Sequence, residues 1–141
     1  MVAAGGALAV QMPNNHAAPS HTASIDLARS DRWRAKLKDL VRTRPVADSR
    51  VYYTFLAPHF ATVDIWENEY LQVLPPRVDG EHPVVAWTKG TWLAPFLAAL
   101  DTSERTEFLR DYTQRMVIAY PPEPDGCTLF PFRRNFIVAT Q

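Results

Sequence analysis

The sequence predicts an α/β protein, because two kinds of apolar periodicity alternate along its 141 residues. Alternation with a period of two over residues 61–74 and 128–140 is typical of strands. An apolar run at residues 7–10, between a glycine pair and a polar loop, predicts a buried strand near the start. The segments between these strands place apolar residues at helical spacing. We therefore expect three strands separated by several helices.

The stretch that follows the first strand is polar. Residues 14–24 contain Pro19 and predict a loop at the carboxyl end of that strand, which is the ligand edge of open α/β sheets. Ser30 or Asp31 can cap a helix through residue 41 with Trp33 on its apolar face. A second helix is expected from residue 48 or 49 to a proline at 58.

The second half of the chain contains the clearest helix signal. A helix is expected from residue 84 to 89, broken by Gly90 and resumed to residue 100. Asp101 stands three residues before Glu104, which predicts a capping box and a helix that ends at the proline pair 121–122. The final strand, 128–140, is expected in two pieces with a kink at Pro131, and one of its faces should carry Phe130, Phe132, Phe136 and Val138.

Composition excludes several functional classes. Fifteen Lys and Arg balance fifteen Asp and Glu, so the chain lacks the charge that nucleic-acid and anionic-membrane partners require. Cys127 is the only cysteine, which excludes an internal disulfide and fits a reducing cytoplasm. No run approaches the ~20 apolar residues that span a bilayer. We expect a cytoplasmic protein and a small-molecule partner.

Familiar catalytic motifs are absent from the sequence. The five glycines form no glycine-rich phosphate loop, and the four histidines lack the spacing of a zinc site, so no metal is predicted. There is no nucleophile motif of the hydrolases. His16 and His21 flank the loop after the first strand, where contact with a ligand is one interpretation beside a structural role. The other two histidines, His59 and His82, are interpreted as surface or helix-end residues.

Two clusters carry the remaining chemistry. The first is residues 87–92, in which Lys89 and two hydroxyls lie between Trp87 and Trp92. In the second, Arg133 and Arg134 are adjacent within a strand, so at most one of them can point to a given pocket. A planar guanidinium beside aromatic rings suits a carboxylate, although a solvated or salt-bridged arginine is an equally good interpretation.

Five stretches together resemble a known family. They are GGALAVQMPNN, YYTFLAPHFATVDIWENEY, VVAWTKGTWLAPFLAAL, YPPEPDG and TLFPFRRNFIVA. In order and spacing they resemble the C-terminal half of the bacterial trans-aconitate 2-methyltransferases, which depend on S-adenosylmethionine and have the class I methyltransferase fold. The resemblance covers nearly the whole chain. It implies the C-terminal portion of a Rossmann-like sheet, namely strands five to seven with the last one antiparallel, plus inserted lid helices.

The same resemblance implies that residues 1–141 form a single partial methyltransferase domain. In the family, the glycine-rich loop and the acidic residue that bind S-adenosylmethionine lie upstream of the matching region, so the cofactor-binding residues of this chain are unknown. We expect the chain alone to be inactive and to need a missing N-terminal half or a partner chain. An alternative is a non-catalytic binding or interaction module that pairs with another chain through an exposed sheet edge.

The activity implied by the resemblance is transfer of a methyl group to a carboxylate of trans-aconitate or a similar small polycarboxylic acid. A carboxylate is already ionised at neutral pH, so no general base and hence no catalytic residue is expected. Where the family usually has a glycine and an arginine, this chain has Trp92 and Ala94, which leaves the substrate open. The expected substrate-binding residues are Asn14, Asn15, His16, Trp87, Lys89, Trp92, Arg133 and Arg134.

Overall fold

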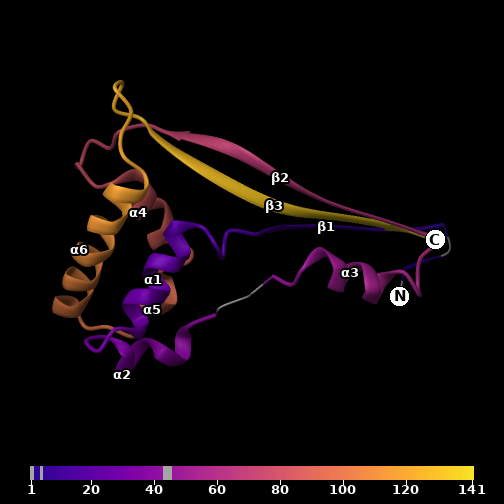
Figure 1. Cartoon of the computed structure of the whole chain (residues 1–141), viewed down its shortest axis with the longest axis horizontal. Coiled ribbons are helices and arrows are strands. Elements are labelled where there is room, and N and C mark those ends of the chain that lie inside the picture. Colours follow the sequence, from indigo (N-terminus) through magenta and orange to yellow (C-terminus); the bar gives the residue numbers. More distant parts are fainter. Residues whose placement is uncertain (1, 4, 43–45) are drawn as a thin grey trace. The chain divides into compact units, whose positions relative to one another are not determined.

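A computed structural model describes residues 2–3, 5–42 and 46–141 of the chain. Within these residues the elements are β1 (Ala7–Pro13), α1 (Pro19–Arg29), α2 (Arg34–Leu37), a 3₁₀ turn (Lys38–Leu40), α3 (Ser49–Leu56), β2 (Thr62–Leu74), α4 (Pro83–Lys89), α5 (Ala94–Ala98), α6 (Thr102–Ala119) and β3 (Thr128–Thr140). The α/β class predicted from the sequence is confirmed (Figure 1).

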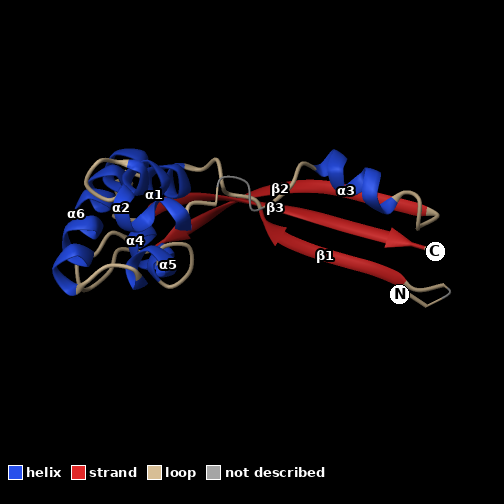
Figure 2. Ribbon diagram, turned by 90° about the horizontal axis from the view of Figure 1, so that it is seen from below, coloured by secondary structure: helices blue, strands red, loops and turns tan. Residues whose placement is uncertain are grey.

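The three strands form one sheet in the order β1-β3-β2, with β3 in the middle (Figure 2). β1 pairs antiparallel with β3, from Ala7 opposite Thr140 to Pro13 opposite Arg134. The last strand is therefore antiparallel to the first, as expected. It is continuous, and the expected division at Pro131 is wrong. Because the pairing with β1 ends at Arg134, Pro131 lies where β3 has no β1 residue opposite, so its missing N–H is tolerated.

The chain divides into two compact units, and β2 and β3 contribute to both. Unit 1 comprises residues 1–15, 44–70 and 131–141, and unit 2 comprises residues 16–43 and 71–130. In unit 1, α3 lies against one face of the strands, with the Tyr52 hydroxyl 3.5 Å from the Met12 sulfur (Figures 1 and 2). The single partial domain expected from the sequence stays a prediction.

Unit 2 is a helical layer with a close-packed core. α6 packs against α1 and α4, and Phe108, Tyr112 and Met116, spaced by four residues on α6, are fully buried. The expected capping box is present, since the Glu104 amide donates to Asp101 and the Asp101 amide donates to Glu104. None of the helices in the described ranges is long and apolar enough to cross a membrane.

Three local expectations are wrong. Residues 19–24 belong to α1 rather than to a loop, because Pro19 occupies the first helical turn, where a missing N–H costs nothing. The helix expected at 31–41 contracts to α2 and the 3₁₀ turn, whose caps receive no side-chain hydrogen bond. β1 is half-buried or exposed along its whole length rather than buried, because only β3 pairs with it.

The predicted faces of β3 also need a correction. Phe130 and Phe132 are buried as expected, but beyond the arginines the buried positions are Asn135, Ile137 and Ala139, while Phe136 and Val138 are only half-buried. The covered face of the strand thus changes between residues 132 and 135. Trp66 of β2 stacks on Phe136 on the less covered face, with the ring centroids 5.3 Å apart.

Candidate functional site

Asn14 and Asn15 lie directly after β1, in unit 1, as the sequence predicts. The Asn15 side chain continues the β1–β3 pairing: its Oδ1 accepts from the Arg133 N–H at 2.8 Å and its Nδ2 donates to the Arg133 carbonyl at 3.2 Å. Asn15 is 6% exposed. Both of its polar atoms therefore serve the backbone of β3, which makes Asn15 a structural part of this site.

Asn14 lies in a polar cluster with Glu67 and Asn135, two residues that were not predicted from the sequence. Its Nδ2 donates to Glu67 Oε1 at 2.8 Å and to Asn135 Oδ1 at 3.2 Å. A carboxylate can only accept, so Glu67 fixes the orientation of the Asn14 amide, and Asn14 in turn fixes that of Asn135. Asn14 Oδ1 and Asn135 Nδ2 are then buried without a partner among the described residues.

Asn135 is the residue that sequence reasoning overlooked. It is fully buried in β3, between the two arginines and Phe136. A buried amide group without a hydrogen-bond partner reduces the stability of the fold by about 1–3 kcal/mol. Such groups are rare in native structures, so the unpaired amide of Asn135 suggests a role beyond packing. An asparagine at a buried position of an apolar strand was the signal that could have identified it.

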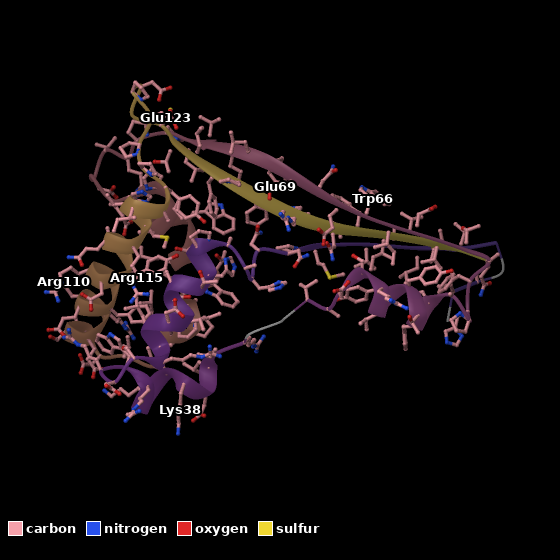
Figure 3. The ribbon with its side chains drawn as sticks, in the orientation of Figure 1. Lys38, Trp66, Glu69, Arg110, Arg115 and Glu123 are labelled. Carbon is pink, nitrogen blue, oxygen red and sulfur yellow. The ribbon has the colours of Figure 1, made fainter. Side chains whose placement is uncertain are left out.

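The two arginines point to opposite faces of the sheet, as expected for neighbours in a strand. Arg133 pairs with Glu69 of β2 at 3.1 Å, and Figure 3 labels Glu69 beside Trp66 on this strand. Arg134 donates to the Tyr70 hydroxyl at 3.2 Å and to Gln11, and its guanidinium lies 5.2 Å from the centroid of the Phe132 ring. Arg133 and Glu69 are both about half exposed, so their ion pair is weak.

The other four predicted site residues, His16, Trp87, Lys89 and Trp92, belong to unit 2. Lys89 at the end of α4 forms an ion pair with Glu81 at 2.6 Å. Trp87 on the same helix meets Phe130 edge-on, with centroids 5.3 Å apart. Its indole is thus part of the apolar packing between α4 and the start of β3.

Trp92 covers the N-terminal half of α1. Its Nε1 donates to Ser24 Oγ at 2.7 Å, and its ring lies 4.3 Å from that of His21. Burial, together with the charge of nearby His16, lowers the pKa of His21 to about 4. His21 is therefore neutral at physiological pH, and its Nδ1 lies 3.1 Å from Ser20 Oγ.

A buried polar network continues from Ser20 into α6. The Tyr112 hydroxyl donates to the Ser20 carbonyl at 2.8 Å, and the Ser20 N–H donates to the Tyr120 hydroxyl at 3.2 Å. Burial raises the pKa of the Tyr112 hydroxyl, which keeps it protonated. The start of α1 is thus held by two tyrosines about a hundred residues away, which compensates for the missing side-chain cap.

The sequence matches known proteins over nearly its whole length. The chain is 42% identical over 136 residues to a trans-aconitate 2-methyltransferase of Rhodopseudomonas palustris (strain BisB5) and 43% identical over 137 residues to that of Rhodococcus jostii (strain RHA1). Each alignment covers 96% of this chain and 52% of the relative. The chain matches the C-terminal half of trans-aconitate 2-methyltransferases.

A third such methyltransferase, from Agrobacterium fabrum, is 39% identical over 138 residues with the same 52% coverage. The chain therefore spans about half the length of the trans-aconitate 2-methyltransferases that it matches. No protein-family model matches the chain. The resemblance drawn from the five motifs is confirmed, while the individual substrate-binding residues stay predictions.

Proposed function

We propose that this chain is the substrate-side half of an S-adenosylmethionine-dependent carboxyl methyltransferase acting on trans-aconitate or a similar small polycarboxylic acid. The observation that supports this most is the identity of about 40% with trans-aconitate 2-methyltransferases over 96% of the chain. The order β1-β3-β2, with β3 antiparallel to β1, is compatible with strands five, seven and six of a class I sheet.

The described residues contain no glycine-rich loop of the kind that commonly binds the nucleoside of a cofactor. The glycines occur singly or as the pair at 5–6, and those with positive φ lie in turns, at residues 5, 80 and 126. None of them gives the glycine-rich backbone that lets a nucleotide approach closely. We therefore assign cofactor binding to the part of the relatives that this chain does not match.

The role left to this chain is to hold and orient carboxylates. The substrate carboxylate is its own nucleophile, so positioning accounts for the contribution of the protein, and correct positioning can lower a barrier by about 7–11 kcal/mol. Lys89 and Arg133 now pair with Glu81 and Glu69 at the surface. Such surface pairs are worth about 1 kcal/mol or less, so a carboxylate of the substrate can replace either acidic partner at low cost.

Asn14 and Asn135 give the site a buried amide pair. Asn14 Oδ1 and Asn135 Nδ2 offer one acceptor and one donor that no described residue uses. We assign Asn14 and Asn135 to ligand binding and Glu67 to the orientation of the Asn14 amide, while Asn15 holds the end of β1 against β3. His16, Trp87, Trp92 and Arg134 remain assigned to the walls of the substrate site.

Methylation of trans-aconitate tests this function. The purified chain, given S-adenosylmethionine with a labelled methyl group, should form no ester. A fusion of the unmatched half of the Rhodopseudomonas palustris enzyme to this chain should form it. In the fusion, Lys89→Ala should raise the KM for trans-aconitate about tenfold. Lys38→Ala, which removes an exposed lysine of the 3₁₀ turn, should leave it unchanged.

Two results would contradict the proposal. Robust methylation by the 141-residue chain alone would refute the division into halves, and a well-folded fusion without activity would refute the methyltransferase assignment. The alternative, a non-catalytic module, is favoured by the free edge of β1. It predicts that the chain binds a partner polypeptide tightly while the complex methylates nothing.

A further inference from the structure

We infer that Arg134 is the cation of unit 1 that binds a carboxylate of the substrate, and that Tyr70 and Gln11 are positioning residues that hold its guanidinium for this contact. The inference rests on the proposed function, because it takes a polycarboxylic acid as the ligand. It deepens that function by distinguishing Arg134 from Arg133, its neighbour in β3, and by adding two residues to the site.

The partners of Arg134 are all uncharged. Its Nε donates to the Tyr70 hydroxyl at 3.2 Å, and a second N–H donates to the side-chain oxygen of Gln11. Its guanidinium lies 5.2 Å from the centroid of the Phe132 ring, whose negative face attracts a cation. None of these contacts neutralises the positive charge of Arg134.

The other basic side chains predicted for the substrate site differ from Arg134 in this respect. Arg133 is paired with Glu69, and Lys89 is paired with Glu81. No carboxylate of the described residues forms an ion pair with Arg134. A substrate carboxylate must therefore displace an acid at Arg133 or Lys89, but not at Arg134.

The surroundings of Arg134 on its face of the sheet are also free of acidic residues. β1 contains no charged residue. On β2 and β3, the flanking positions that share this face by alternation are Asn68, Gln72, Phe132 and Phe136. Arg134 is half-buried. Charges that lose water are normally paired, so a half-buried cation among neutral neighbours has the features of an anion site.

The guanidinium of Arg134 keeps donors for a carboxylate. A guanidinium has five N–H groups, and Tyr70 and Gln11 use two of them. The remaining groups allow the two parallel hydrogen bonds with which arginine binds a carboxylate. Because two partners already fix the side chain, it loses less conformational freedom when a ligand binds.

The position of Arg134 along the strands agrees with this role. Arg134 lies opposite Pro13, the last residue of β1, so it is at the strand end where ligands of α/β sheets bind. Asn135 points to the other face at the same end. The two side chains would thus contact different carboxylates of one tricarboxylic acid.

Binding of trans-aconitate to the fusion of the two halves tests Arg134. S-adenosylhomocysteine replaces S-adenosylmethionine, so that calorimetry measures binding without methyl transfer. Arg134→Gln should weaken binding about 10- to 100-fold, because the charged hydrogen bonds are lost. Arg133→Gln is the matched control and should change the Kd less than threefold, since Glu69 already neutralises that charge.

Arg134→Lys gives a second measurement if Arg134→Gln does not fold, which circular dichroism shows. It keeps the charge but loses the planar fork and the contacts that orient it, so its Kd should lie between those of the parent and of Arg134→Gln. Binding by Arg134→Lys that equals the parent's would contradict the role assigned to Tyr70 and Gln11.

A double-mutant cycle tests the positioning residues directly. Tyr70→Phe and Gln11→Leu should each weaken binding several-fold in the parent fusion and have no further effect beside Arg134→Gln. Tyr53→Phe, at a 54% exposed tyrosine of α3, should leave the Kd unchanged. An equal loss with and without Arg134 would show that Tyr70 and Gln11 act only through the stability of the fold, and would overturn their assignment.

The outcomes separate this inference from the proposed function. A fusion that binds and methylates trans-aconitate, and whose Kd ignores Arg134→Gln, would overturn the inference and leave the function intact. A fusion that binds trans-aconitate through Arg134 but forms no ester would refute the function and leave the carboxylate contact intact. A folded fusion that binds no trans-aconitate would refute both.

Discussion

Unit 1 and unit 2 use a similar supply of aromatic residues in opposite ways. In unit 2, Phe96, Phe108 and Tyr112 are at most 2% exposed, and the rings of Phe96 and Phe108 stack with centroids 6.3 Å apart. In unit 1, Phe55 and Trp66 are 71% and 44% exposed. The difference shows that the described part of unit 2 buries its large rings in its own core, whereas unit 1 leaves several of its large rings exposed.

The largest expected contrast is between core truncations in the two units. Phe108→Ala should reduce the free energy of unfolding by about 3–5 kcal/mol, because it leaves a cavity between Trp33 and Phe96. Trp66→Ala, which removes a half-exposed ring stacked on Phe136, should cost about 1 kcal/mol. Urea unfolding followed by circular dichroism measures both. Equal costs would mean that unit 1 is as well packed as unit 2.

The next effect concerns the acid stability of unit 2. The pKa of His21 is lowered to about 4 from an ordinary 6.5. Between pH 6.5 and pH 4 the unfolded chain therefore binds a proton at His21 that the folded chain does not bind. The contribution of the neutral His21 to the free energy of unfolding is complete above pH 6.5, falls as the pH drops, and is lost by about pH 4. The loss amounts to about 3 kcal/mol.

The comparison of the parent chain with His21→Gln isolates this contribution. Between pH 7 and pH 4.5 the parent should lose more unfolding free energy than the variant, since the titration of the carboxylates is common to both. An NMR titration of the His21 ring should give a midpoint near pH 4. A midpoint near 6.5 would show that Trp92 does not keep the imidazole dry.

A smaller effect tests the end of β1 in unit 1. Asn15→Ala should cost about 1–3 kcal/mol, because the Arg133 N–H loses its acceptor in a buried setting. Asn15→Asp keeps that acceptor and serves as the matched control. Hydrogen exchange at the Arg133 amide should accelerate in the alanine variant and much less in the aspartate variant. Equal protection in the two variants would show that Asn15 does not extend the pairing of β1 with β3.

Sequence reasoning succeeded where the signals were local. The bounds of β2 and β3 follow from alternation and turn residues, and α6 follows from the pair Asp101 and Glu104. α1 was missed because its cap residue Ala18 gives no side-chain signal and Pro19 was interpreted as a breaker. Tyr112 and Tyr120 hold the start of this helix from far along the chain, and no local pattern carries that information.

The candidate site divides in the same way. Asn14 and Asn15 were predicted because polar residues after an apolar strand mark a ligand edge. Their separate tasks could not be predicted, since these depend on Glu67, Asn135 and the Arg133 backbone, which lie at least fifty residues away. The exposure of β1 was also missed, because an apolar run does not reveal how many neighbours its strand has.

The contact between Trp92 and His21 should make the fluorescence of this tryptophan sensitive to pH. A neutral imidazole beside an indole interferes little with its fluorescence, whereas a protonated imidazole attracts and quenches the excited ring. Because the two rings lie 4.3 Å apart, the emission of this tryptophan should dim as His21 gains its proton. The fluorescence intensity of Trp92 would thus report the protonation state of His21 without any added dye.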